Sequence, residues 1–331
     1  MKISLQLIVA LFVSVLFLSC KKEPYVPAES QPVPPIYVTI ALHIEDVPKY
    51  AFCDSFVVYR QKLLQFAEAM APWNVKFNLQ VDYEFLMGIK NCEHPGMQSE
   101  TMGMNLLEYL ISQYNYEIDP HQEGGCDTCG LDNYADIKCL GFQITPNISD
   151  VMGGLVHDDD AQWNALAQGQ QGNIYPQFEW TPEILTLAVG TQHHFGDFSF
   201  DDYASGVWIP KGTGSDFWVH DPSGPFIYIG PGEYDNWSSV PRQRSTLEFI
   251  EMLRFLLTNH LIKRDAMYTA SIAVPQHMIF NPVQHLRLMD LLDKLLPYVD
   301  EGKVVFVHYS EAAEIWKDTY DSKPNIVFLD E

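Results

Sequence analysis

The first apolar run after residue 35 ends in side chains that can bind metal ions or move protons. Residues 41–48 read ALHIEDVP, which puts His43, Glu45 and Asp46 directly behind a β-branched stretch. On a strand, His43 and Glu45 point to the same side because side chains alternate, and Asp46 begins the turn. An imidazole with carboxylates suits a divalent transition ion such as zinc, with open positions for water and substrate. These residues are therefore candidate metal ligands or proton acceptors.

Two further apolar stretches end in the same way. His121 and Glu123 follow the strand-like segment 114–121, which also contains Asp119. His308 ends an apolar segment near the C-terminus. In parallel barrels the carboxyl ends of the strands open onto one face, and active sites are built there. We therefore expect the three groups to meet, although they lie far apart in the sequence.

The elements that would position these groups alternate between strands and helices. Strands are expected at 37–43, 75–81, 114–121, 184–190, 206–210, 217–221, 226–230, 267–274 and 303–309, and helices at 54–72, 102–113, 134–142, 245–262, 281–299 and 310–320. This alternation predicts a parallel sheet built from right-handed crossovers. A single (β/α) barrel, complete or partly open, is favoured over an open doubly wound sheet because no Gly-rich phosphate turn follows the first strand. The middle of the chain, 143–240, is rich in loops.

The start of the chain predicts export and a lipid anchor. Residues 1–20 pair one lysine with an apolar run that ends at Cys20, as in a bacterial lipoprotein signal with lipidation at that cysteine. An uncleaved anchor helix is the alternative. Residues 21–36 have the Pro-rich composition of an extended spacer. The remaining 37–331 fit one large domain, held on a membrane in the periplasm or at the cell surface by the anchor alone.

The charge of the chain limits its partners. The sequence has 43 acidic and 20 basic residues, which gives a formal net charge of -23. Such a surface repels nucleic acid, anionic polysaccharide and anionic lipid, so a neutral or cationic ligand is expected. No feature of the sequence predicts a protein partner.

The cysteines after position 20 leave their pairing open. They are Cys53, Cys92, Cys126, Cys129 and Cys139. An exported chain permits disulfides, and an odd number leaves at least one thiol or an external partner. The CxxC at 126–129 could form a tight disulfide, a redox pair or half of a metal site. Because no second CxxC is present, a disulfide or plain thiols are favoured over a zinc knuckle.

The order of these elements and motifs resembles the polysaccharide deacetylase family. The family's first motif, T-F-D-D-G, is similar to HIEDV at 43–47, its second, H-[ST]-x-x-H, shares only the first histidine with HQEGG at 121–125, and its last matches VFVH at 305–308. The resemblance implies an irregular, about seven-stranded (β/α) barrel. It also implies hydrolysis of N- or O-acetyl groups on sugars with one bound divalent metal ion.

The resemblance assigns roles to individual residues. Glu45 would be the catalytic base, and His308 would protonate the leaving group. Asp46 and His121 would hold the metal, expected to be zinc. Gly125 stands where the family has its second metal-binding histidine, and no Arg-x-Pro motif is evident.

The missing histidine leaves the third metal ligand open. Glu123 and His43 are the candidates, and the metal could also be absent. Asp119 would not bind the metal itself but would orient the residues that do.

Aromatic residues crowd the middle loops and could form a groove for a glycan. Trp180 and Trp208, with His194, are candidate substrate-binding residues, because sugar rings stack on aromatic faces. The competing interpretation of each tryptophan is ordinary core filling.

The sequence is also compatible with two other functions. A sugar-binding lipoprotein whose catalysis has decayed would explain Gly125. A barrel glycoside hydrolase would use two carboxylates roughly 5 to 9.5 Å apart, pairing Glu45 or Asp46 with Asp201, Asp202 or Glu233.

Overall fold

The structure, a computed structural model, describes residues 32–44, 48–121, 133–188, 204–232 and 245–329. The chain divides into a unit that ends at Val33 and a large unit, Pro34–Glu331. The expected signal segment with Cys20 lies outside the described residues. Within the described residues, no helix is long and apolar enough to cross a membrane.

The strand that ends at the first histidine lies at the centre of a five-stranded sheet. Its members are β1 (Ile36–Ile44), β2 (Asn78–Val81), β3 (Glu117–Pro120), β10 (Tyr268–Val274) and β11 (Val304–Phe306). All the pairings are parallel; β10 lies along one edge of β1, and β11 and β2 also pair with β1, with β3 beyond β2. Every residue of β1 except His43 is buried, which explains its nearly continuous apolar sequence.

A second sheet has four short strands. Its order is β4 (Val151–Gly153), β7 (Ile184–Thr186), β9 (Ile227–Pro231) and β8 (Ser205–Trp208). The first three run parallel and β8 is antiparallel to β9. A separate hairpin joins β5 (Gln170–Gln171) to β6 (Glu179–Trp180).

The two sheets meet at two edges without a continuous ladder. Single parallel bridges at Ile118↔Ile148 and His121↔Gly153 link β3 to the β4 side. At the other edge, Ser205 Oγ donates to Thr269 O at 2.8 Å. The expectation of an α/β protein with parallel strands is confirmed, but a closed seven-stranded barrel is not shown, because the hydrogen-bonded pairing defines two sheets.

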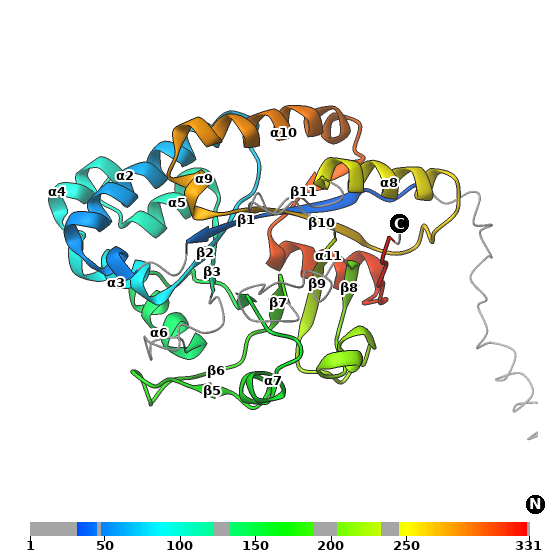
Figure 1. Cartoon of the computed structure of the whole chain (residues 1–331), viewed down its shortest axis with the longest axis horizontal. Helices are drawn as coiled ribbons and strands as arrows, with labels where there is room; N and C mark the ends of the chain where they lie inside the picture. The colour runs from blue at the N-terminus through cyan, green and yellow to red at the C-terminus, as the bar shows by residue number, and fades with distance from the viewer. Residues whose placement is uncertain (1–31, 45–47, 122–132, 189–203, 233–244, 330–331) are drawn as a thin grey trace, which may run out of the picture. The chain divides into compact units, whose positions relative to one another are not determined.

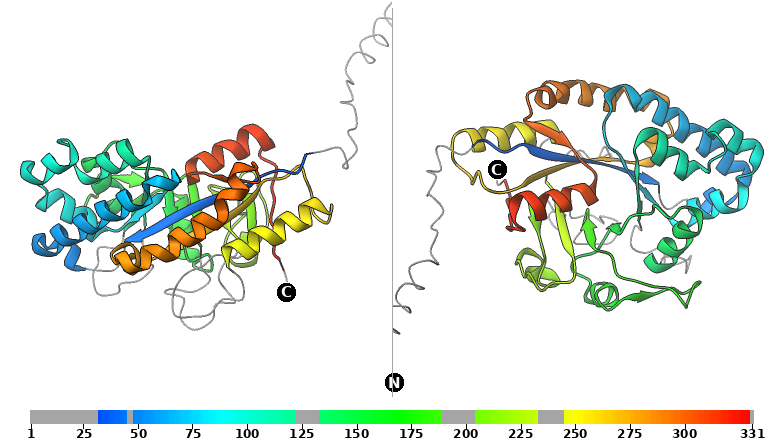
Figure 2. Two further views of the ribbon diagram at one scale, coloured as in Figure 1. Left: turned by 90° about the horizontal axis from the view of Figure 1, so that it is seen from above. Right: turned by 180° about the vertical axis from the view of Figure 1, so that it is seen from behind.

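Helices occur throughout the described residues and are not confined to one side of the five-stranded sheet (Figure 1). They are α2 (Cys53–Met70), α3 (Tyr83–Cys92), α4 (Pro95–Gln98), α5 (Leu106–Tyr114), α6 (Tyr134–Ile144), α7 (Asp160–Ala167), α8 (Thr246–Thr258), α9 (Gln276–Ile279), α10 (Pro282–Asp300) and α11 (Tyr309–Tyr320), with short 3-10 turns at Pro48–Ala51, Ala71–Trp73, Ser99–Thr101 and Gly214–Trp218. Figure 1 shows α8 and α10 on one side of β1 and β10, with α11 on the other. Figure 2 shows the same order from behind.

Local signals explain where several helices begin. The Ser245 hydroxyl and the Glu248 carboxylate form a capping box at the start of α8, an arrangement that satisfies free backbone donors. α5 begins later than expected because Met102 and Gly103 have positive φ angles of 54° and 83°. Asn105 then caps the helix by accepting from Glu108 N at 3.0 Å.

The described elements differ from the expected ones in several places. The strand expected at 217–221 is instead the end of the 3-10 turn Gly214–Trp218, which begins at a glycine with a φ of 55°. The pattern also did not predict the elements α3, α4, α7, α9, β4, β5 and β6. The strand β4 has only three residues, too few to show an alternation.

Two hydrophobic clusters of the described residues involve the four-stranded sheet. One lies between the two sheets, where Tyr37 of β1, Ile229 of β9 and Trp316 of α11 belong to one buried cluster. The other lies behind the four-stranded sheet and contains Trp163, Trp208 and their aromatic neighbours. The first cluster is the one that underlies the candidate site.

One cysteine pair is settled by the structure. Cys53 at the start of α2 and Cys92 at the end of α3 form a disulfide. Cys139 is a buried free thiol. The CxxC at 126–129 lies outside the described residues.

Candidate functional site

Two of the three expected groups meet at the carboxyl ends of β1 and β3. The imidazole rings of His43 and His121 have centroids 4.7 Å apart and are inclined at 79°. His43 is partly exposed, whereas His121 is only 3 % exposed. The edge of one ring therefore faces the plane of the other, at the end of the sheet where active sites of parallel α/β proteins are built.

A row of polar side chains crosses the sheet beside these rings. His43 is in register with Gln80 of β2, and Gln80 with Asp119 of β3. Residues in register on neighbouring strands lie about 4.8 Å apart and point to the same face. Gln80 and Asp119 are both 0 % exposed, so the row continues from the partly exposed His43 into the interior.

Gly153 of β4 makes room for this row. An ideal Cβ at Gly153 would stand 2.6 Å from Gln80 Nε2 and 2.7 Å from His121 Nδ1. Any larger residue would therefore push on both side chains. The bridge between His121 and Gly153 fixes the two backbones beside each other.

Asp119 is a carboxyl group in a buried position. Ser149 Oγ donates to its Oδ1 at 2.5 Å, while its Oδ2 has no hydrogen-bond partner among the described residues. Burial, together with the nearby Glu117, raises the pKa of Asp119 well above its ordinary value, opposed by Ser149 and by Lys138. A raised pKa favours the protonated carboxyl, which can donate a hydrogen bond.

Hydroxyl groups are also buried among the apolar side chains between the two sheets. Thr39 Oγ1 and Ser271 Oγ are 2.7 Å apart. Tyr309, at the start of α11, is buried. Burial raises the pKa of its phenol, and the hydroxyls of Thr186, Thr39 and Ser271 oppose that rise. The hydrophobic interior between the sheets thus contains a few hydroxyl groups.

The structure does not bring His308 to the histidine pair. The strand β11 pairs only with the first part of β1, ending at Val38↔Phe306. His308 therefore leaves the sheet near the amino ends of β2 and β3, where its Nε2 lies 2.7 Å from the carbonyl of Asn115. Burial lowers the pKa of His308. The next residue, Tyr309, is the one that faces the interior.

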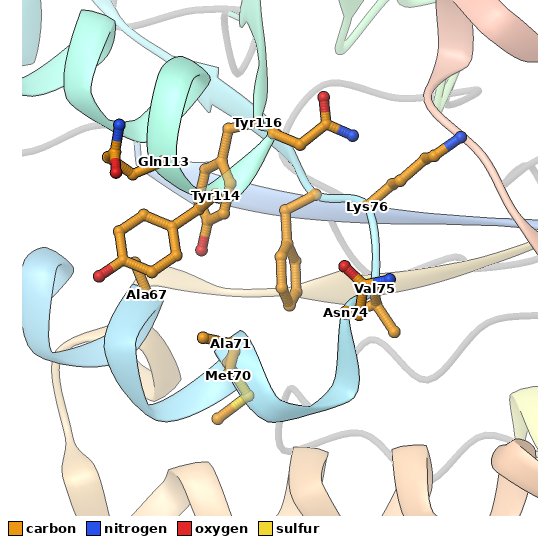
Figure 3. Close-up of a pocket in the computed structure, with 11 residues that line it drawn as sticks. Ala67, Met70, Ala71, Asn74, Val75, Lys76, Gln113, Tyr114 and Tyr116 are labelled. Carbon is orange, nitrogen blue, oxygen red and sulfur yellow. The ribbon is translucent and has the colours of Figure 1, made fainter.

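A pocket lies beside this amino end. It has a volume of about 210 Å³ and lies between the end of α2 and the segments that lead into β2 and β3. Figure 3 shows the rings of Tyr114 and Tyr116 on one side of it and Met70 and Ala71 on the other. The pocket includes neither member of the histidine pair, so it is not part of the candidate site.

Several expected site residues fall outside the described ranges. They are Glu45, Asp46, Glu123 and His194. Within the described ranges, no group of three His, Cys, Asp or Glu side chains could hold a metal ion. His43 and His121 supply two imidazoles, so the described residues do not by themselves form a complete set of ligands for zinc, which takes at least three from the protein.

The two expected glycan-stacking tryptophans are core residues. Trp208 is 0 % exposed and donates from Nε1 to Phe217 O at 2.7 Å. Trp180 is 6 % exposed and donates to Asp150 Oδ1 at 3.0 Å. Their ring faces are covered by protein, so the expectation that they stack on a sugar is corrected in favour of core filling.

Sequence reasoning missed three residues that the structure places at the site. They are Gln80, Gly153 and Ser149. The segment NLQV of β2 carried a usable signal, because Asn78 and Gln80 interrupt an otherwise apolar strand at alternate positions. A polar side chain on a strand that is buried on both faces needs a partner or a function.

The fold and the site define a mixed α/β protein whose histidine pair lies at the carboxyl ends of parallel strands. No family model matches the chain, and no curated protein matches it. Among solved structures, the chain is similar to a 4-alpha-glucanotransferase from Thermococcus litoralis, with a TM-score of 0.46 and 13% identity. The alignment covers 88% of this chain and 41% of that one. A match at this level establishes neither a family nor an activity.

Proposed function

We propose that the chain is a hydrolase that removes N- or O-acetyl groups from a neutral glycan. The observation that supports the proposal is the His43–His121 pair at the carboxyl ends of β1 and β3. The motifs at 43–47 and 121–125 that resemble polysaccharide deacetylases contain these same two histidines. The proposal includes an irregular barrel, formed by the two sheets where their edges meet at β3 with β4 and at β8 with β10.

The histidine pair can supply the proton transfers that the reaction needs. A neutral imidazole of the pair takes a proton from water, which bonds to the acetyl carbon. The bond from that carbon to the sugar's nitrogen or oxygen then breaks, and the departing atom receives the proton. A positioned acid or base contributes roughly 10²–10⁴-fold to such a rate.

A divalent ion would use the same two imidazoles as ligands. Glu45, Asp46 and Glu123 follow the two histidines by two or three positions in the sequence, and one of them would have to complete the set. We assign no step to an ion, since the described residues provide only the two imidazoles. Metal analysis of the purified protein distinguishes the two roles, because a ligand role predicts an equimolar ion that is lost in His121→Ala.

The class of substrate follows from the charge of the chain. A net charge of -23 opposes the binding of anionic polymers. A neutral acetylated glycan, reached from a lipid-anchored position outside the cytoplasm, fits this charge and the predicted export signal.

Acetate release from neutral acetylated oligosaccharides tests the proposal. We expect release by the wild type and loss of at least about tenfold in kcat in His43→Ala and in His121→Ala. His308→Ala is the matched control, because it removes a histidine that lies away from the pair and should keep its activity. Loss of activity in His308→Ala alone would contradict the proposed site.

The products separate the competing functions. Shortened oligosaccharides with their acetyl groups intact would support a glycoside hydrolase. Binding of the oligosaccharide without any product would support a glycan-binding protein.

A further inference from the structure

Gln80 combines complete burial with two unpaired polar atoms. Its side chain is 0 % exposed, and neither Oε1 nor Nε2 has a hydrogen-bond partner among the described residues. A buried polar group without a partner destabilises a protein by about 1–3 kcal/mol. An apolar residue of the same length would avoid this cost, so the amide at this position calls for a functional explanation.

The neighbour of Gln80 in register has a third atom of the same kind. Asp119 of β3 is also 0 % exposed, and its Oδ2 has no partner among the described residues, whereas Ser149 holds Oδ1. Since side chains in register lie on one face about 4.8 Å apart, the amide and this oxygen are neighbours on that face. They lie beside the His43–His121 pair, because His43 is in register with Gln80 and because a Cβ at Gly153 would meet both Gln80 and His121.

We propose that Gln80 and Asp119 bind the water molecule that attacks the substrate. The burial of both residues selects a small occupant, and water is the reactant of that size in a hydrolysis. A buried water makes about three hydrogen bonds, which matches Gln80 Oε1, Gln80 Nε2 and Asp119 Oδ2. The inference rests on the proposed hydrolase function.

The bound water reacts without any further reagent. Its oxygen bonds to the acetyl carbon, and one of its protons passes to an imidazole of the histidine pair. The bond from the acetyl carbon to the sugar breaks, the departing nitrogen or oxygen takes that proton, and acetic acid is released. Gln80 keeps its own protons throughout and acts as a positioning residue.

The variant Gln80→Met tests the assignment, because it keeps the length of the side chain and removes both polar atoms. We expect kcat for acetate release to fall by roughly 10²-fold, as for other losses of positioning, with KM changed less than about twofold. We expect the melting temperature to change little, because the amide makes no hydrogen bond to another described group of the chain. A purely structural role predicts the reverse, namely a lower melting temperature with kcat intact.

Asn325→Leu is the matched control. Asn325 is a buried amide that donates to Met267 O at 2.8 Å, and it was not placed in the site. Its replacement should lower the melting temperature and leave kcat unchanged.

Three results would overturn the inference. An active wild type with full kcat in Gln80→Met would do so, and so would a raised KM with unchanged kcat, which would make Gln80 a substrate contact. An experimental structure that shows ordered waters gives a readout independent of activity, and it should place one water within hydrogen-bond distance of Gln80 and Asp119 Oδ2. A wild type that releases no acetate counts against the proposed function, and a site without that water counts against this inference.

Discussion

The substitution Gly153→Ala would place a methyl group where the Gln80 amide and the His121 ring already lie. The ideal Cβ stands 2.6 Å from Gln80 Nε2 and 2.7 Å from His121 Nδ1, closer than real Cβ contacts. Both neighbours are buried, and an extra methyl group in a packed interior costs about 1–3 kcal/mol. We expect the free energy of unfolding to fall by that amount. We also expect kcat to fall by roughly 10²-fold, the usual effect of moving a catalytic group by about 1 Å.

Gly212→Ala is the control for this prediction. Its Cβ would have one neighbour within 4 Å, the Cβ of Asp216 at 3.6 Å, which is an ordinary contact. Both substitutions reduce the conformational freedom of the unfolded chain to the same extent. A difference between the free energies of unfolding of the two variants therefore comes from contacts in the native state. Urea unfolding and acetate release at saturating substrate are the two assays. Equal stability and activity in the two variants would show that Gln80 and His121 do not fill the space at Gly153.

Three further predictions concern stability. Replacing Cys53 and Cys92 by serine opens a loop with a sequence separation of 39, for which the chain-entropy relation gives a loss of about 4 kcal/mol in urea unfolding. Arg60→Met should cost about 3–5 kcal/mol, because it leaves the buried Glu93 carboxylate without its cation; a loss below 1 kcal/mol would contradict this reasoning. The lowered pKa of His308 means that the native state binds fewer protons than the unfolded state below about pH 6.5. The wild type should therefore lose more stability between pH 7.5 and pH 5.5 than His308→Gln does, as measured by unfolding at both values.

The strands and helices that were predicted best are those with long, regular patterns. The nine residues of β1 and the nineteen of α10 were each placed within a residue or two of their bounds. In the four-stranded sheet β7, β8 and β9 were predicted, whereas β4, with only three residues, was not. Such segments are too short for an alternation of side chains to be distinguished from chance.

The candidate site was predicted in part. The rule that strand ends share a face placed His43 with His121 correctly. The same rule failed for His308, because β11 is short and pairs with the beginning of β1, a register that the sequence does not encode locally. Burial of Trp180 and Trp208 could not be predicted either, since an aromatic residue suits a core and a sugar groove equally well.

The Cys53–Cys92 bridge makes the stability of the chain depend on the compartment in which it folds. In a reducing cytoplasm the two thiols stay separate, and the chain lacks about 4 kcal/mol of a total that is typically only about 5–15 kcal/mol. In an oxidising compartment the disulfide forms and joins α2 to α3, so the folded chain gains that contribution only there.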